Sequence, residues 1–355
     1  MPTSLSTPAP PTELVRTCPL CGRTPRRKLF QTKDRWHHLP GEFGLVRCDC
    51  GLVILSPRPI VEELAFYYPE SDYYSYSSGV SVQAIRSGGL LHRIRDGLRR
   101  AVLSDWGYPM PDLRPWERMV RPIASRLVAN SALYGMADKF PHYRPGGRAL
   151  DIGCGNESFL TYLKHHGWEV AGVELSAAPA RAAKEQFGID VFVGDLADAL
   201  FAPASFDFIH LSHVIEHVSD PIATLKSVAS LLRPDGTVYI ETPNEASFGA
   251  HVCGEYWFPW ESPRHLYVFS PATLLTAVET AGLRVTRMWT GGFPKLFAWE
   301  DTYRQEERGA TVPVRPSLRT YRRPRAVVLD AARRVTLFLR PLSGDILFCL
   351  AEIAR

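Results

Sequence analysis

The stretch Arg148-Ala-Leu-Asp-Ile-Gly-Cys-Gly-Asn-Glu-Ser158 decides the fold of this chain. It reads as an apolar strand ending in Asp151, a turn with Gly153 and Gly155, and the start of a helix. A backbone that turns sharply off a strand and lies against a ligand leaves no room for a Cβ atom, which explains the glycines. Nineteen residues after Gly155, a second strand ends in Glu174, at the spacing where a dinucleotide fold binds a ribose. We therefore expect a ligand with ribose hydroxyls here.

Three further segments indicate the family. They are Phe206–Pro221, Leu231–Asn244 and Pro263–Ser270. Together with Asp151-x-Gly-x-Gly and Glu174, they resemble in order and spacing the motifs of class I S-adenosylmethionine (SAM) dependent methyltransferases. The chain departs from these motifs at Glu157, where such enzymes usually carry a third glycine.

The resemblance implies an α/β fold with a Rossmann-like, doubly wound sheet of seven strands, the last of them antiparallel. It also implies SAM as the cofactor. In the family, the carboxylate at the position of Asp195 lies beside the adenine and Leu196 supplies an amide, although Asp195 could instead cap the next helix. The residues expected to bind SAM are Asp151, Gly153, Gly155, Glu174, Leu175, Asp195, Leu196 and Ser212.

The composition is that of an ordinary soluble protein. The 355 residues carry a formal net charge of +4, too small by itself to indicate a nucleic-acid partner. No apolar run reaches the ~18 residues of a membrane span, and the N-terminus lacks the charged start and apolar stretch of a signal peptide. We therefore expect a cytoplasmic protein without a membrane span.

Four cysteines near the N-terminus predict a structural zinc site. Cys18 and Cys21 form one pair and, after twenty-six intervening residues, Cys48 and Cys50 form another. Two such turns make a four-sulfur site that holds together a module too small to fold on its own core. The second pair has one intervening residue instead of two, so free thiols, or a histidine ligand at position 37 or 38, stay open. The module resembles the N-terminal zinc-binding modules of a subgroup of bacterial methyltransferases.

The chain divides into six expected parts. They are a disordered tail at 1–13, a zinc ribbon at 14–60, a helical linker or lid region at 61–145, a SAM-binding core at 146–290, an arginine-rich helical insertion at 291–343 and a final core strand at 344–355. Within the linker, apolar residues at helical spacing with arginines between them predict an amphipathic helix over 89–105.

The segment after the fourth strand carries the candidate catalytic residues His213, Glu216 and His217. If a helical turn starts at His213, the other two share its face. Three interpretations are open. His217 could be a general base; the three could join His265 around a second divalent metal; or they could brace the loop. The metal arrangement resembles ubiquinone-pathway O-methyltransferases and small-RNA 2′-O-methyltransferases, with His213 replacing a glutamate.

The long segment from Pro243 to Ser270 follows the fifth strand, where acceptors bind in this architecture. We expect Trp257 and Trp260 to form an apolar wall, Arg264 to contact an anionic group and His265 to be a second candidate base. By resemblance, Asn244 lies at the floor of the cavity. Packing of the tryptophans in the core is the alternative.

The last strand is expected at 345–354, after an insertion that holds ten arginines between positions 304 and 340. These arginines could attract an acidic acceptor, or they could simply face water. A helix predicted over 326–339 has an apolar side that could join two subunits in a homodimer.

These observations predict a SAM-dependent methyltransferase that acts on a small or carrier-linked metabolite. Oxygen is the expected acceptor atom, because the histidines supply bases. An RNA methyltransferase is a less favoured alternative, since few aromatic residues accompany the arginines and no RNA-binding module is recognisable. The alternative outside enzymes is a non-catalytic SAM-binding scaffold or sensor.

Overall fold

A computed structural model gives the structure of this protein. It describes residues 8–69, 90–128, 139–155, 158–293, 296–309 and 324–355. Glu157, where the chain departs from the family motif, therefore lies outside the described residues. The same holds for positions 70–76 of a tyrosine-rich segment that spans 67–76. None of the helices in the described part of the chain combines the length and apolar character that a membrane crossing requires.

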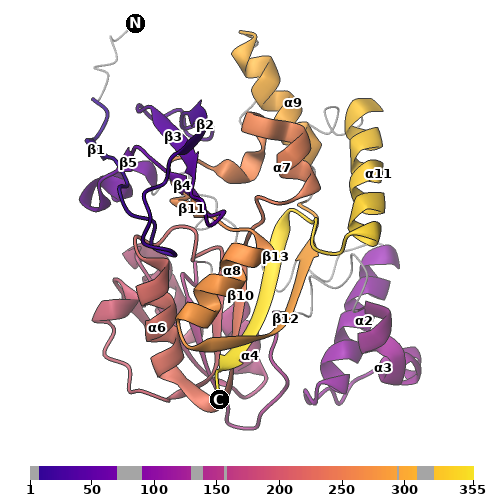
Figure 1. Cartoon of the computed structure of the whole chain (residues 1–355). Coiled ribbons are helices and arrows are strands. Elements are labelled where there is room, and N and C mark those ends of the chain that lie inside the picture. Colours follow the sequence, from indigo (N-terminus) through magenta and orange to yellow (C-terminus); the bar gives the residue numbers. More distant parts are fainter. Residues whose placement is uncertain (1–7, 70–89, 129–138, 156–157, 294–295, 310–323) are drawn as a thin grey trace, which may run out of the picture.

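A seven-stranded sheet forms the centre of the molecule (Figure 1). Its spatial order is β12-β13-β10-β9-β6-β7-β8, and β13 is antiparallel to both of its neighbours while the other pairs are parallel. The predicted seven-stranded sheet with an antiparallel last strand is thereby confirmed. The strands are β6 Arg148–Ile152, β7 Glu169–Glu174, β8 Val191–Val193, β9 Phe206–Ser212, β10 Leu232–Pro243, β12 Leu283–Gly291 and β13 Ile346–Ile353.

Alternating residues of the strands build two layers of core, because successive side chains of a strand point to opposite faces. Leu150 and Ile209 pack in the core on the face covered by α6 and α8, whereas Ala149 and Phe208 pack on the face covered by α4 and α5. The helices are α4 Ser158–His165, α5 Ala177–Phe187, α6 Pro221–Leu231 and α8 Pro271–Thr280.

Local sequence signals fix where these helices begin and end. The carboxylate of Asp220 accepts from two amides of the first turn of α6, and Pro221 follows at the position where a missing N–H costs nothing. Ser270 and Thr273 form a capping box at the start of α8. Gly188, in the left-handed conformation, ends α5.

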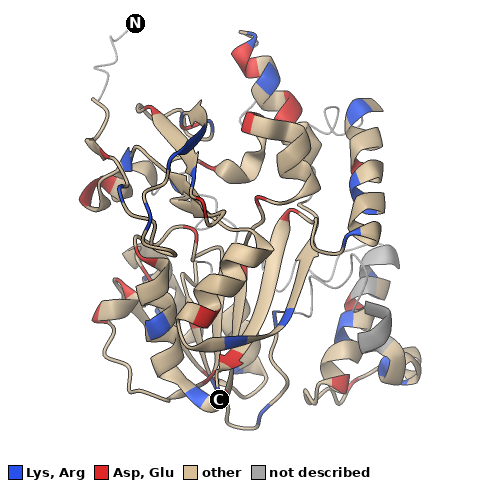
Figure 2. Ribbon diagram, viewed as in Figure 1, with Lys and Arg blue, Asp and Glu red and all other residues tan. Residues whose placement is uncertain are grey.

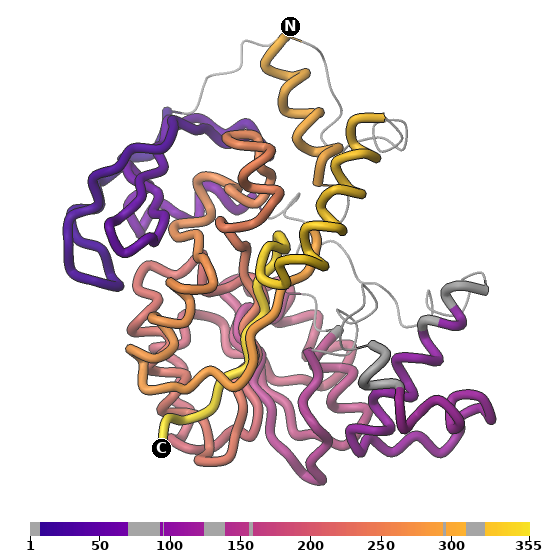
Figure 3. Tube along the Cα trace, turned by 45° about the vertical axis from the view of Figure 1, so that its right-hand side comes forward, coloured from indigo at the N-terminus to yellow at the C-terminus, as the bar shows by residue number. Residues whose placement is uncertain are grey.

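The cysteine module forms a second, four-stranded sheet of order β11-β4-β3-β2. Three of its strands come from the module, but β11 comes from the long segment after β10 and pairs with β4 in antiparallel fashion. Figure 3 shows these distant parts of the chain side by side. The strands are β2 Arg27–Thr32, β3 Phe43–Arg47, β4 Val53–Leu55 and β11 Tyr267–Val268.

Smaller elements complete the N-terminal region. Strand β1 (Thr12–Glu13) pairs with β5 (Arg58–Pro59), so these two residues of the predicted disordered tail are ordered. The predicted amphipathic helix is α2 (Leu90–Asp105), which packs beside α3 (Pro115–Val128). Pro122 lies inside α3. A short helix, η1 (Val61–Tyr67), follows β5.

The insertion after β12 contains α9 (Leu296–Glu307) and α11 (Pro324–Leu339). Figure 1 shows α9 and α7 (Phe248–Cys253) beside the cysteine module, beyond one end of the large sheet. Figure 2 shows basic residues along α11. Several arginines of the insertion are held by acids of the same chain, since Glu300 binds Arg304 and Arg325 while Asp330 binds Arg333 and Arg334.

Candidate functional site

The predicted SAM-binding residues lie at one edge of the large sheet. Strands β6, β7, β8 and β9 are parallel, so their carboxyl ends meet at the same edge. Asp151 lies near the end of β6, Glu174 ends β7, Asp195 follows β8 and Ser212 ends β9. The tertiary structure therefore brings together residues that the sequence spreads over more than sixty positions.

The glycine turn after β6 needs its glycines. Gly153 and Gly155 have φ angles of 66° and 46°, in the left-handed region that side chains disfavour. A Cβ atom on Gly153 would also lie 2.7 Å from Cγ2 of Val214. The turn after β6 and the segment after β9 are thus in direct contact, which places the predicted catalytic residues close to the predicted cofactor site.

Glu174 is buried against this turn. One of its carboxylate oxygens accepts from the amide of Gly155 at 2.9 Å, and the other accepts from the amide of Ser176 at 3.1 Å. The next residue, Leu175, is 73% exposed and offers an apolar surface beside the carboxylate. This arrangement suits a ligand that lies across the turn.

Asp151 has a partner that sequence reasoning missed. Its carboxylate lies 2.7 Å from Nδ1 of His210, and both residues are buried. His210 is the direct neighbour of Asp151 across the strand pair, and its ring stacks on Phe159 with centroids 4.1 Å apart. Finding this pair requires the register of β6 against β9, which the sequence alone does not specify.

Asp195 caps the short helix η4 (Leu196–Asp198), because its carboxylate accepts from the amide of Ala197 at 2.9 Å. This is the alternative that the sequence left open for Asp195, although the side chain is exposed and still has acceptor capacity. Leu196 is buried. The hydroxyl of Ser212 donates to Glu241 at 2.9 Å.

Two histidines meet above the segment that follows β9. The imidazole rings of His217 and His265 have centroids 4.6 Å apart. Nδ1 of His217 lies 3.1 Å from the carbonyl oxygen of Arg264, and Nδ1 of His265 lies 2.8 Å from that of Pro259. A carbonyl oxygen only accepts hydrogen bonds, so these two contacts favour a proton on each Nδ1 and a lone pair on each Nε2. The Tyr68 hydroxyl oxygen, 2.9 Å from Nδ1 of His217, can accept from the same N–H.

Both rings are neutral at physiological pH. Burial, together with the neighbouring His265, lowers the pKa of His217 to about 4. Burial likewise lowers the pKa of His265 to about 4. His217 is half-buried whereas His265 is buried, with Nε2 of His265 3.7 Å from Glu261. The Nε2 atom of His217 is therefore the more accessible acceptor of a proton.

His213 differs from the other two histidines. Its φ angle of 54° places it in the left-handed region, and the turn that leads to His217 closes on the carbonyl of Val214, one residue after the start considered for the sequence. Its Nδ1 lies 3.0 Å from Glu216 and its Nε2 lies 3.5 Å from Glu241. Burial alone would lower the pKa of His213, but its hydrogen bonds to these two carboxylates raise it well above the usual value. A histidine that holds its proton so firmly is an ion-pair partner instead of a base.

Glu216 joins this cluster to the surrounding loops. Burial would raise its pKa, but the hydrogen bond from His213 lowers it to about 2. Its second oxygen accepts from the hydroxyl of Thr242 at 2.9 Å, and its carbonyl accepts from the amide of Leu266 at 2.8 Å. Glu216 thus fixes the loop that carries His265.

The structure assembles three of the four residues considered for a second metal. One ligand atom from each of Glu216, His217 and His265 lies within 4.8 Å of the others. In the described part of the chain, His213 is not a member of this group. His213 instead lies with its Nδ1 3.0 Å from Glu216, so three of the four residues considered could share one ion.

Tyr68, immediately after η1, is a site residue that the sequence did not single out. Its hydroxyl oxygen lies 2.9 Å from Nδ1 of His217. The sequence indicates only that the tyrosine-rich segment 67–76 could form a wall of a substrate pocket or pack between modules. Tyr68 belongs to the N-terminal part of the chain, so this part contributes directly to the histidine site.

The four residues expected to line the acceptor cavity are largely engaged in internal contacts. Trp257 and Trp260 are 1% and 6% exposed, and their rings pack with centroids 4.9 Å apart. The amide of Asn244 donates to the carbonyls of Leu342 and Gly344, which ties the loop after β10 to the start of β13. These contacts favour a role of both tryptophans in core packing. Asn244 was expected at the floor of a cavity, but its amide binds backbone carbonyls of the chain.

Arg264 likewise has partners other than the expected anionic group of an acceptor. Its guanidinium is fully buried and binds Asp34 and Glu261. Arg264 thus binds anionic groups, as predicted, but these groups are carboxylates of the same chain.

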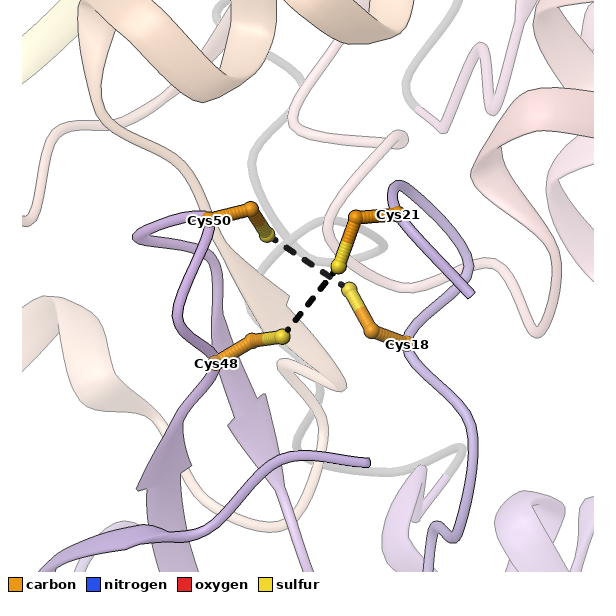
Figure 4. A group of neighbouring side chains, drawn as sticks. All are labelled: Cys18, Cys21, Cys48 and Cys50. Atoms are coloured by element: carbon orange, nitrogen blue, oxygen red, sulfur yellow. Dashed lines mark hydrogen bonds between the residues drawn. The ribbon is translucent and has the colours of Figure 1, made fainter. Parts of the chain in front are cut away.

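The four cysteines of the N-terminal module converge (Figure 4). The Sγ atoms of Cys18 and Cys50 lie 3.7 Å apart, and those of Cys21 and Cys48 lie 3.4 Å apart. A tetrahedral zinc with Zn–S bonds of about 2.3 Å has sulfur atoms about 3.8 Å from one another. The four sulfurs thus fit a zinc ion, in spite of the short second pair. The alternative of a ligand at His37 or His38 is not needed.

Comparison with known proteins shows that this chain is similar to methyltransferases. The family model described as a methyltransferase domain matches residues 125–287. The ubiquinone biosynthesis O-methyltransferase of Parvibaculum lavamentivorans is 32% identical over 202 residues, which cover 53% of this chain and 79% of that protein. The enzyme of the same name from Dinoroseobacter shibae is 31% identical, with 52% and 79% covered.

Coverage is lower for other relatives of that name. The enzyme from Xanthomonas campestris pv. campestris is 31% identical over 153 residues, and the match spans 40% of this chain and 64% of the relative. Among solved structures, a SAM-dependent methyltransferase from Archaeoglobus fulgidus is 20% identical, with a TM-score of 0.41 over 67% of this chain and all of that chain.

Proposed function

Since this chain belongs to the SAM-dependent methyltransferases, we propose that it transfers a methyl group to an oxygen atom of a small or carrier-linked metabolite. The relatives named as O-methyltransferases support oxygen as the acceptor atom. The single observation that carries the proposal is the contact of His217 Nδ1 with the carbonyl oxygen of Arg264 at 3.1 Å, which favours Nε2 as the proton acceptor.

The cofactor would lie across the carboxyl ends of β6, β7 and β8. Gly153 and Gly155 supply the tight turn against which it would lie, and Glu174 would accept hydrogen bonds from its ribose hydroxyls. The exposed carboxylate of Asp195 and the side chain of Leu175 would flank the adenine. SAM supplies a methyl group on a positively charged sulfur, which makes the leaving group good.

His217 would act as the general base. Nε2 of His217 would take the proton of the acceptor hydroxyl while the methyl group passes to the oxygen. The bond between the methyl carbon and the sulfonium sulfur would break in the same step, and its electron pair would leave with the sulfur as a neutral thioether. The protein mainly has to hold the two reactants in line, and this placement accounts for a large part of the rate. His265, with the same tautomer beside it, would orient the hydroxyl. His213 keeps Glu216 ionised and so stabilises the loop.

A second divalent metal remains the alternative use of this cluster. Glu216, His217 and His265 would be its ligands, since imidazole and carboxylate suit such ions. The positive charge of His213 beside Glu216 argues against it. Dialysis against a chelator separates the two, because a base needs no added metal and a metal site does.

Four sulfur atoms at tetrahedral spacing support structural zinc in the N-terminal module.

For the quaternary structure, α11 exposes an apolar stripe that could join two copies of the chain. Light scattering of the purified protein gives the mass that decides between monomer and dimer. The residues of the stripe are Val327, Val328, Val335, Phe338 and Leu339.

The decisive experiment is transfer of labelled methyl from SAM into a host extract that is then split into metabolites, carrier proteins, lipid and RNA. Label in the metabolite or carrier fraction, lost with His217→Gln, is the expected result. Label in RNA would support the RNA methyltransferase. An extract that stays unlabelled although the protein binds SAM would support a non-catalytic scaffold.

A further inference from the structure

A buried ion pair joins the cysteine module to the loop that carries the histidine site. Arg264 and Asp34 have fully buried side chains. Nη2 of Arg264 lies 2.9 Å from Oδ1 of Asp34, and Nη1 lies 3.2 Å from Oδ2. The contact is thus two-pronged, the geometry that fixes both the position and the orientation of a guanidinium.

Asp34 is held in place by its own module. It lies between β2 and β3, and its Oδ1 also accepts from the amides of Trp36 and His37, at 3.0 and 3.1 Å. The position of the carboxylate is therefore set by the turn that it caps, independently of Arg264. The module supplies a fixed anchor, and Arg264 is the group that is anchored.

The main chain of Arg264 sets the state of His217. While its side chain reaches into the cysteine module, its carbonyl oxygen lies 3.1 Å from Nδ1 of His217. This carbonyl shares the contact with the Tyr68 hydroxyl, whose oxygen lies 2.9 Å from the same nitrogen. Of the two, only the carbonyl is restricted to accepting a hydrogen bond, so it is the group that favours a proton on Nδ1. His265 is the next residue in the chain, so a shift of Arg264 moves a contact of one histidine and the backbone of the other.

We propose that Asp34 is a positioning residue for His217, acting through Arg264. Asp34 holds the guanidinium, which fixes the carbonyl oxygen that keeps the proton on Nδ1 and leaves Nε2 free. The inference rests on the proposed role of His217 as the base. It gives the cysteine module a part in the reaction, although none of its described residues is among the predicted catalytic ones.

Loss of the Asp34 charge should act locally. Glu261 still lies 3.2 Å from Nε of Arg264, so the guanidinium keeps one ionic partner. The pairing of β11 with β4 and the bonds from Leu266 and Tyr267 to the carbonyl of Glu216 still hold the loop. The expected change is therefore a shift of the Arg264 backbone instead of unfolding.

The test measures the tautomer of His217 by two-bond ¹⁵N–¹H correlation spectra of labelled protein. In the unchanged protein, His217 and His265 both show a protonated Nδ1. Asp34→Asn should convert His217 into a mixture of the two tautomers and leave His265 as it was. Glu245→Gln is the matched control: it breaks the other two-pronged ion pair between module and core, with Arg47, and should leave both rings unchanged.

A second variant guards against loss of folding in Asp34→Asn. Arg264→Lys keeps the charge and the main chain but cannot form the two-pronged contact, so it should give the same mixture. A folded variant of either kind in which His217 keeps a pure Nδ1–H tautomer overturns the inference. If His217 of the unchanged protein already lacks a protonated Nδ1, the assignment of the base fails instead, so the two failures are distinguishable.

Discussion

The amide of Gly155 donates to the carboxylate of Glu174 at 2.9 Å, across the ends of two neighbouring strands. The contact joins the glycine turn to the acid that follows it by nineteen residues in the sequence. Both groups belong to the predicted cofactor site. The carboxylate of Glu174 is therefore held against the glycine turn by a backbone hydrogen bond.

We expect Glu174→Ala to weaken SAM binding by more than about tenfold, or about 1.4 kcal/mol. The variant removes the acceptor for ribose hydroxyls and also releases the amide of Gly155. Calorimetric titration with SAM measures the change. Glu185→Ala is the control, because Glu185 is an exposed acid on α5. Unchanged affinity in Glu174→Ala would remove this residue from the ribose role.

His217→Gln should lower methyl transfer by about 100-fold or more, the usual contribution of a general base. SAM affinity should stay the same, since the cofactor does not need the imidazole. Rates of label transfer at saturating SAM, with calorimetry of the same samples, give both numbers. His251→Gln, at an exposed histidine on α7, serves as control. A normal rate in His217→Gln would exclude the base assignment.

About one zinc ion per chain is expected in the purified protein. Cys48→Ser should lose most of this zinc and lower the unfolding temperature, because the metal would join the two turns that carry the cysteine pairs. Elemental analysis and thermal unfolding measure the two effects. Cys349→Ala, at a buried cysteine of β13, should keep its zinc. A metal-free chain with unaltered unfolding would contradict the prediction.

Asp207 should contribute to stability at neutral pH but not in acid. Burial would raise its pKa, but the amide of Arg148 and the guanidinium groups of Arg233 and Arg144 outweigh burial and lower the pKa. A depressed folded pKa means that the stabilisation is complete above the unfolded value, about 3.9, and is lost as the pH falls through the folded pKa.

Asp207→Asn should therefore reduce the free energy of unfolding by about 1–3 kcal/mol at pH 7, the cost of removing one partner from a buried charged hydrogen bond. The difference from the unchanged protein should shrink below about pH 4, where the carboxyl of the unfolded chain takes up its proton, and should vanish below the lower folded pKa. Urea unfolding at both pH values measures it, with Asp198→Asn at an exposed acid as control. A difference that is equally large in acid would show that charge is not the cause.

Much of the fold was predictable from local patterns. Strand β6 precedes the glycine turn and β7 ends at Glu174, as predicted, and β13 lies within the predicted last strand. Alternating or continuous apolar runs, with glycine and acid at their ends, set these limits through backbone geometry alone. The cysteine pairs likewise mark their site by spacing, because each pair is a single turn.

The sequence by itself determined the sheet, the glycine turn with Glu174 and the cysteine cluster. Only the tertiary structure decided the roles of Arg264, His213 and Asn244, each of which looked like a residue for a ligand. Asp34 and Arg264 are 230 positions apart, and His213 owes its charge to Glu241 as well as to its near neighbour Glu216. A turn is specified by the residues within it, whereas the partner of a buried charge depends on which distant segment the packed chain places beside it.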